Sequence, residues 1–251
     1  MRLDISFKDV RQCLRFTLGL AIYACGTYAL VKTDLGLAPW EIFAMGISFH
    51  TPISFGQSII AISIVIVIID IILKGTIGVG IIIDTLLVGT FVDIVTMIDF
   101  LPDLNGLPIR IGVYLAGITV MSFGMFLTLT AAQGVGPRDT LMIVIGKRFP
   151  RVPIGAVQSG LLLFAFTMGL LLGGPVGIGT VISVTCMGPL LQVWCHLFRF
   201  EPRNVVHKSL LDYFRDPGDR RDTEERSDHE ERSDLEERRD PEERRGPEPK
   251  A

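Results

Sequence analysis

Residues 35–41 read Leu-Gly-Leu-Ala-Pro-Trp-Glu, and residues 133–139 read Gln-Gly-Val-Gly-Pro-Arg-Asp. The two stretches place a glycine, a proline and an acid in the same order, at a constant offset of 98 residues. A proline followed two residues later by an acid is typical of the first turn of a helix, where free N–H groups and the helix dipole favour a carboxylate. The sequence therefore contains a duplicated helix start, whose structural residues are Gly36, Pro39, Trp40, Gly134 and Pro137 and whose acids are Glu41 and Asp139.

The duplication extends well beyond this motif. Gly26 recurs as Gly124 at the offset of 98, and five later glycines recur at an offset of 99. Those five are Gly56, Gly75, Gly78, Gly80 and Gly89, with counterparts Gly155, Gly174, Gly177, Gly179 and Gly188. Glycine and proline mark turns, helix ends and close backbone approach, so the duplicated feature is a backbone plan.

Charge is distributed very unevenly along the 251 residues. Residues 1–200 hold 10 acids and 12 lysines or arginines, whereas residues 201–251 hold 17 acids and 12 bases. Residues 16–31, 111–137 and 152–198 carry no Asp, Glu, Lys or Arg, and the last of these runs is interrupted by a Gly-Gly-Pro turn. An apolar run of about 18 residues can cross a hydrocarbon core of about 30 Å. We therefore predict an all-α membrane protein, not a soluble one, with six transmembrane helices at about 12–31, 54–73, 78–98, 110–131, 154–172 and 177–198.

These spans divide the chain into five parts: a cytoplasmic N-terminus (1–11), membrane repeat 1 (12–98), an outer loop (99–109), membrane repeat 2 (110–200) and a charged tail (201–251). Lysine and arginine gather on the segments that lie inside if the N-terminus is cytoplasmic, so both termini are predicted to be cytoplasmic. Three spans per repeat is an odd number, and the second repeat must therefore be inverted in the membrane relative to the first. Inverted repeats are frequent in secondary transporters, where they meet around a site near the midplane.

Segments 38–50 and 137–149 follow the duplicated helix starts and are too short to span the membrane. In one interpretation they are re-entrant half-helices that bring Glu41 and Asp139 together to bind a cation or exchange a proton. In the other they lie at the membrane interface, with Trp40 as an anchor and the acids as helix caps. Arg138 beside Asp139 favours the interfacial alternative, because such a charged pair is stable at a wet surface.

Three acids lie inside predicted spans. Asp70 has a partner in Lys74, four residues further along the same helical face, and we interpret that pair as structural. Asp84 and Asp93 lie on opposite faces of a regular helix, so both cannot line one cavity unless the helix breaks. We select Asp84 as a candidate for solute or ion binding, and the alternative is a bond between neighbouring helices.

Gln57 and Gln158, each just inside a span, are weaker candidates for solute or ion binding and could instead hydrogen-bond between helices. Gly78 and Gly177 belong to the duplicated glycine turns, which we assign to tight packing, because no Lys-Ser or Lys-Thr follows as in a phosphate-binding loop. The four cysteines show neither metal-ligand spacing nor a disulfide framework. No metal and no cofactor are therefore expected.

These residues carry a resemblance to the YczE/YyaS/YitT family of bacterial integral membrane proteins. The similar elements are the first-span glycines, residues 36–41, the Phe-Gly-Gln entry to the second span at 55–57, and the glycine turn at 75–80. The resemblance covers about residues 10–200 and implies a multi-pass protein of the bacterial cytoplasmic membrane, sometimes suspected of transport. It implies no catalytic residues.

The tail consists of six-residue units from Asp216 onward, rich in Asp, Glu and Arg. Six residues do not match the helical period, and almost nothing apolar is present to bury, so we expect a disordered cytoplasmic tail. A partner-docking role and a neutral repeat expansion both fit it. Its net negative charge argues against nucleic-acid binding.

From these features we expect a secondary transporter or exporter of a small solute, with Glu41, Asp139 and Asp84 as its binding or coupling groups. The alternative is an accessory or scaffold protein that supports another membrane or biosynthetic system. An enzyme is not expected, because no nucleophile with a base or metal cluster is present. The expected partners are the lipid bilayer, an unidentified small molecule or ion, and a second copy of the chain.

Overall fold

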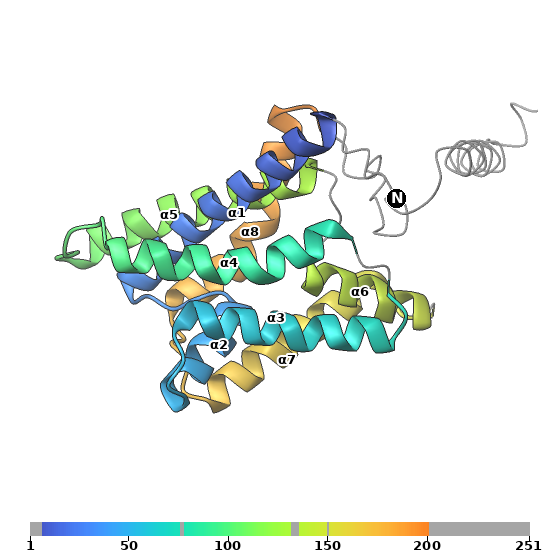
Figure 1. The fold of residues 1–251 in the computed structure, drawn as a ribbon. Coiled ribbons are helices and arrows are strands. Elements are labelled where there is room, and N and C mark those ends of the chain that lie inside the picture. The colour runs from blue at the N-terminus through green and yellow to red at the C-terminus, as the bar shows by residue number, and fades with distance from the viewer. Residues whose placement is uncertain (1–6, 76–77, 132–135, 150, 201–251) are drawn as a thin grey trace, which may run out of the picture. The chain divides into compact units, whose positions relative to one another are not determined.

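The computed structural model describes residues 7–75, 78–131, 136–149 and 151–200, which form eight α-helices and no strand (Figure 1). The predictions made for the tail therefore lie outside the described residues. The helices are α1 (Phe7–Thr33), α2 (Pro39–His50), α3 (Phe55–Ile72), α4 (Val79–Ile98), α5 (Leu107–Thr130), α6 (Pro137–Arg148), α7 (Ile154–Leu171) and α8 (Ile178–Leu197).

Six of these helices are long and apolar enough to cross a membrane: α1, α3, α4, α5, α7 and α8. The apolar stretch of the first is Val10–Thr33, and that of the last is Ile178–Leu197. The boundaries of all six agree with the predicted spans to within three residues. The prediction of an all-α, six-span membrane protein is confirmed. The two remaining helices, α2 and α6, begin at the duplicated prolines and have 12 residues each.

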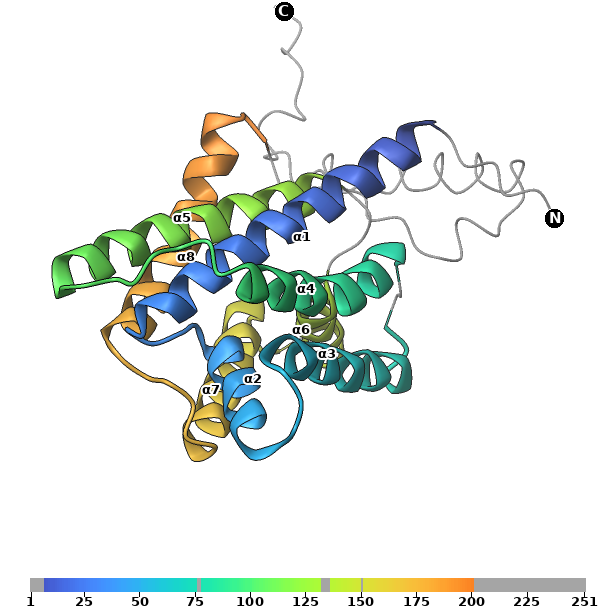
Figure 2. The same cartoon turned by 60° about the vertical axis from the view of Figure 1, so that its left-hand side comes forward.

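Helices α1 and α5 lie side by side along much of their length (Figures 1 and 2). Glycine allows this close approach, because a Cβ added to Gly26 would lie 2.6 Å from the backbone nitrogen of Met121. A Cβ added to Gly124 would likewise lie 2.5 Å from the backbone nitrogen of Tyr23. Gly124 and Met121 follow Gly26 and Tyr23 by 98 residues, so the repeat offset exchanges the two contacts.

Most other helix contacts obey the same exchange. Helix α2 packs on α7 as α6 packs on α3, and α1 packs on α4 as α5 packs on α8. Because α2 also contacts α3, and α6 contacts α7, the helices α2, α3, α6 and α7 form a closed ring of neighbours. Each short helix thus packs between a long helix of its own repeat and one of the other repeat.

The contact between α3 and α4 does not follow this exchange between the repeats. Helices α3 and α4 approach through Gly56 and Gly89, where an added Cβ on either residue would overlap the backbone carbonyl oxygen of the other. The counterparts in α7 and α8, Gly155 and Gly188, have no atom within 4 Å of an added Cβ. The second repeat has therefore kept these glycines without the helix crossing that requires them in the first.

Ion pairs join the loops at one end of the α1–α5 pair. Lys32 Nζ lies 2.8 Å from Asp99 Oδ1, and Arg110 Nη2 lies 3.3 Å from Asp34 Oδ2. Lys32 and Arg110 are the two bases that the sequence places on the predicted outer side, and each is paired with an acid.

Candidate functional site

Helices α2 and α6 begin in the same way. Their N-cap residues, Ala38 and Gly136, are extended, and a proline occupies the first helical position of each. Proline fits there because its fixed φ suits a helix and the N–H group that it lacks would have no intrahelical partner. The sequence prediction of two proline-initiated helices, each with an acid in its first turn, is therefore confirmed. At 1.5 Å per residue, 12 residues extend about 18 Å, well short of a bilayer core.

The acid of the first motif is buried among three helices. Glu41 is only 2% exposed. Its Oε1 accepts a hydrogen bond from the Tyr23 hydroxyl of α1 at 2.9 Å and lies 3.2 Å from Arg138 Nη1 of α6. The pair joins the two repeats, because Glu41 belongs to the first copy of the duplicated motif and Arg138 to the second.

Arg138 also lies over an aromatic ring. Its Cζ is 5.1 Å from the centroid of Trp40, and Trp40 is 9% exposed. A guanidinium at that distance from the face of an indole makes a favourable cation–π contact. Trp40 is therefore packed inside the protein and is not an anchor on its outer surface. Arg138 pairs with Glu41 across the repeat boundary, which corrects the expectation of a surface pair with its neighbour Asp139.

Asp84 approaches the same place from α4. A Cβ added to Gly136, the N-cap of α6, would lie 3.3 Å from Asp84 Oδ2. Asp84 therefore lies beside the N-terminus of α6, where the helix dipole favours negative charge. Arg138 interacts electrostatically with Asp84 and with the half-buried Asp139. We call Tyr23, Glu41, Asp84, Arg138 and Asp139 the polar cluster.

The polar cluster contains three acids and a single base. A carboxylate in a low-dielectric interior is stable only with a counter-charge, hydrogen bonds or a bound proton. Among the residues that the structure describes, the Arg138 guanidinium is within ion-pair distance of Glu41 alone. The arrangement can therefore accept a proton or a cation, and release of Glu41 would free Arg138 to bind an anionic group.

The other polar candidates do not join the cluster. Asp93 accepts a hydrogen bond from the backbone N–H of Gly56 at 2.8 Å and another from the Ser54 hydroxyl, so it caps α3. Gln57 is exposed and completes a capping box with Ser54 at the same helix start. Gln158 is exposed on α7. Gln57 and Asp93 therefore have local structural roles in this arrangement.

The predicted Asp70–Lys74 pair is absent. Asp70 is fully buried and neither carboxylate oxygen has a hydrogen-bond partner, while Lys74 is exposed. The reason is that α3 ends at Ile72, and Lys74 adopts a left-handed conformation with φ of 59°. A spacing of four residues aligns two side chains only while the helix continues.

Two of the motif glycines, Gly36 and Gly177, lie at tight packing contacts. Gly36 has φ of +105°, a conformation that other residues rarely adopt, and an added Cβ would lie 2.7 Å from Thr180 Oγ1 near the start of α8. A Cβ added to Gly177, the N-cap of α8, would likewise collide with the backbone carbonyl oxygen of Leu35. Gly78 is the N-cap of α4, whereas Gly134 lies outside the described residues.

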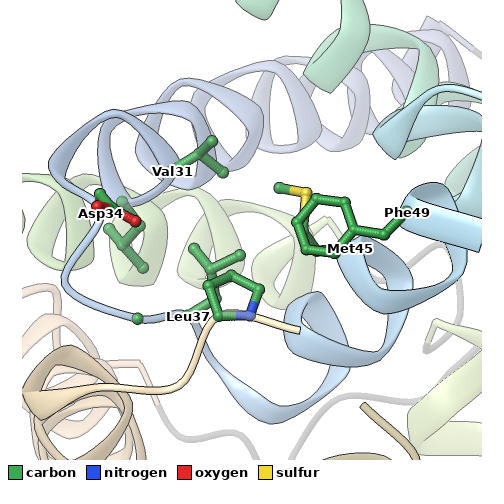
Figure 3. A pocket seen from close by; sticks show the side chains of 8 residues that line it. Val31, Asp34, Leu37, Met45 and Phe49 are labelled. Carbon is green, nitrogen blue, oxygen red and sulfur yellow. The ribbon is translucent and has the colours of Figure 1, made fainter. Parts of the chain in front are cut away.

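A cavity of about 200 Å³ includes none of the residues of the polar cluster in its lining. It lies between the end of α1, the segment that leads into α2, the second half of α2 and the loop before α8 (Figure 3). Figure 3 shows a mainly apolar lining, with Leu37, Met45 and Phe49 on one side and Asp34 at the margin. Asp34 is already paired with Arg110, so the cavity offers no free charge from its lining.

Residues 10–196, which include the starts of α2 to α8 and the whole polar cluster, match a protein family described as a family of unknown function, DUF6198. The chain belongs to this family. Among similar proteins, an uncharacterized protein of Haemophilus influenzae is 34% identical over 189 residues, covering 75% of this chain and 85% of that protein. The uncharacterized membrane protein YczE of Bacillus subtilis is 28% identical over 71% of this chain and 84% of its own length.

A third relative, the uncharacterized protein YyaS of Bacillus subtilis, is 24% identical over 71% of this chain and 90% of its own length. These matches confirm the resemblance to the YczE/YyaS family, and with the six apolar helices they identify a multi-pass membrane protein of the DUF6198 family. No solved structure matches the chain.

Two members of the cluster were not selected from the sequence. Tyr23 lies in the apolar first span, and its counterpart at the repeat offset is Met121, so the motif comparison gave no signal for it. Arg138 was assigned to a surface pair, although it replaces Trp40 at an otherwise duplicated position. That substitution of a cation for an aromatic residue was the available signal, because the two residues stack in the structure.

Proposed function

We propose that this DUF6198 protein is a secondary transporter or exporter of a small solute in the cytoplasmic membrane of a bacterium. The observation that carries the proposal is the buried pair of Glu41 and Arg138, which unites the first turns of the two duplicated short helices. Charges within a membrane protein are costly, and they commonly mark solute or proton pathways.

The short helices support the proposal through their length and burial. Six of the 12 residues of α2 are buried, and these include the whole Pro-Trp-Glu start. A helix too short to cross the bilayer, yet enclosed by long helices, fits the re-entrant alternative better than the interfacial one. In this arrangement α2 and α6 enter from opposite faces and meet at the polar cluster.

The repeat relation supports an inverted arrangement. Three spanning helices in each repeat and reciprocal contacts across α1 and α5 fit two halves related by an axis in the membrane plane. Both bases on the predicted outer side are paired with acids, which fits cytoplasmic N- and C-termini. The exposed apolar side chains of α7 and α8 then face lipid.

The polar cluster supplies a coupling step in this proposal. Protonation of Glu41 neutralises the partner of Arg138, and the guanidinium then becomes free to bind an anionic group of the solute. Loss of that proton restores the Glu41–Arg138 pair and displaces the solute. Asp84 and Asp139 keep the cluster attractive to protons, because they leave acids in excess over the single base.

Flux in vesicles tests the proposal. The protein is reconstituted into liposomes that contain a pH-sensitive dye, and a panel of small carboxylates, amines and amino acids is added under an imposed pH gradient. We expect at least one compound to cause a protein-dependent pH change that Glu41→Gln reduces at least tenfold. Thr167→Val, which changes an exposed residue of α7, should retain the flux.

Two results would contradict the proposal. No protein-dependent pH change across the panel would overturn transport and favour the accessory role. Equal flux in wild type and Glu41→Gln would remove Glu41 from the mechanism.

Single cysteines at positions 43 and 142, in a chain without its four native cysteines, test the re-entrant arrangement. We expect both to be protected from membrane-impermeant maleimide. Full labelling of both, from opposite sides of the membrane, would show that α2 and α6 lie at the interface.

A further inference from the structure

A second polar site lies outside the polar cluster, between α3 and α6. Asp70 is 0% exposed and Thr140 is 3% exposed. Both carboxylate oxygens of Asp70 and the hydroxyl of Thr140 lack a hydrogen-bond partner, and within the described residues they are the only buried side-chain polar atoms in that condition. Buried polar groups are nearly always paired, so these three atoms require an explanation.

Helix packing places the two residues at one helix interface. Helix α3 packs against α6. A Cβ added to Gly75, just after α3, would lie 2.8 Å from Val144 Cγ2 and 3.5 Å from Asp70 Cβ, so Asp70 and Val144 flank the same point. Thr140 precedes Val144 by four residues on the same face of α6.

The repeat provides an independent placement. The counterpart of Asp70 at the offset of 99 is Gly169, which contacts Ile42 of α2. The counterpart of Ile42 at the offset of 98 is Thr140. Where one half packs a glycine against an isoleucine, the other half therefore carries an aspartate and a threonine at the matching positions. The polar residues replace an apolar contact at matching positions.

No described residue supplies a counter-charge to Asp70. Its own helix end provides Lys74, which is exposed. Among the elements packed against α3, the charged or titratable groups are Glu41 and His50 of α2, Asp84 and Asp93 of α4, and Arg138, Asp139, Lys147 and Arg148 of α6. None of these forms an ion pair or hydrogen bond with Asp70.

An ionised carboxylate in this setting would be buried without compensation, which is strongly unfavourable. A proton removes the charge and converts one oxygen into a donor, and the Thr140 hydroxyl of the facing helix has no other partner. A bound metal ion would need several oxygen ligands, and no group of three acidic, histidine or cysteine side chains in the described chain is arranged to hold one. The proton is therefore the ligand that the geometry favours.

We propose that Asp70 and Thr140 form a proton-binding site at the α3–α6 contact, in which Asp70 takes a proton from water and becomes a neutral acid. No covalent bond other than this O–H bond forms or breaks. Lys74 is exposed one turn beyond Asp70, so water lies close to the site. Loss of the proton would place an uncompensated charge against α6, the helix whose first turn carries Arg138. The site stands independently of the transport proposal.

Infrared difference spectroscopy of the full-length protein in lipid tests the site. The protonated carboxyl C=O band is recorded through a pH titration. Asp70→Asn should remove one carboxyl's share of this band and leave the rest, which belongs to other acids. Asn has the size and neutrality of the protonated acid, so this variant should fold. Thr140→Val should retain the band and shift its frequency, because the protonated acid loses the hydroxyl proposed as its acceptor. Asp103→Asn, at an exposed loop position, is the matched control and should leave the band unchanged.

Two results would overturn the proposal. An unchanged band in Asp70→Asn would show that Asp70 is not protonated in the folded protein. Loss of the Asp70 share on adding sodium in place of choline, at constant pH and ionic strength, would show that the site takes a metal cation instead.

Discussion

Replacing Glu41 and Arg138 separately should cost more stability in total than replacing both together. Arg138→Met leaves Glu41, which is 2% exposed, with the Tyr23 hydroxyl as its remaining donor. Removing one partner of a buried ion pair costs about 3–5 kcal/mol. The Arg138 side chain is 25% exposed, which places the expected cost near the lower end, at about 3 kcal/mol. Loss of the stacking on Trp40 adds about 0.5–1 kcal/mol.

The double variant Glu41→Gln with Arg138→Met removes both charges and leaves groups of similar volume. Buried ion pairs replaced in this way often lose little stability, so its cost should fall below the sum of the single costs by about 2–3 kcal/mol. The assay is the free energy of unfolding in mixed micelles, measured by circular dichroism during SDS titration at one salt concentration. Additive single and double costs, within about 0.5 kcal/mol, would show that the two side chains do not interact in the folded protein.

Three further predictions concern packing, hydrogen bonding and pH. Gly26→Ala should lower the melting temperature through a clash worth about 1–3 kcal/mol, whereas Gly160→Ala on α7, with no atom within 4 Å of the new Cβ, should leave it unchanged or raise it; equal effects would refute the α1–α5 contact. Tyr23→Phe should cost about 1.5–3 kcal/mol in the same SDS titration, because it removes a hydrogen bond to a buried carboxylate, and no loss would mean that this bond is not formed. The hydrogen bond from Lys32 holds the pKa of Asp99 below its ordinary value. Wild type should therefore be more stable than Asp99→Asn at neutral pH, and this difference in stability should vanish as the pH falls through the lowered pKa. Melting temperatures across the acid range measure the difference, and a difference that grows on acidification would contradict the prediction.

The spanning helices could be predicted because their signal is local. A long uncharged run needs no knowledge of its neighbours, and the predicted boundaries agree with the structure. The starts of α2 and α6 were also readable, since proline and an acid act within one turn. The glycines at 26 and 124 revealed the duplicated plan, although only the structure shows that each contacts the other repeat.

The pairing of side chains could not be predicted in the same way. Glu41 and Arg138 lie 97 residues apart, and the sequence indicated only the local pair between Arg138 and Asp139. The Asp70–Lys74 prediction failed because it assumed that the helix continues through Lys74, two residues beyond the end of α3 at Ile72. Both errors arise from applying short-range spacing rules to contacts that the tertiary fold decides.

The glycines of the α3–α4 crossing and their counterparts in the second repeat differ in how well they should tolerate mutation. At 56 and 89 any side chain would collide with backbone, whereas the same residue type at 155 and 188 meets open space. Sequence identity between the halves therefore conceals unequal constraint: a substitution that breaks the first repeat can pass unnoticed at the matching position of the second. The two copies of one ancestral plan are free to diverge at different rates, position by position.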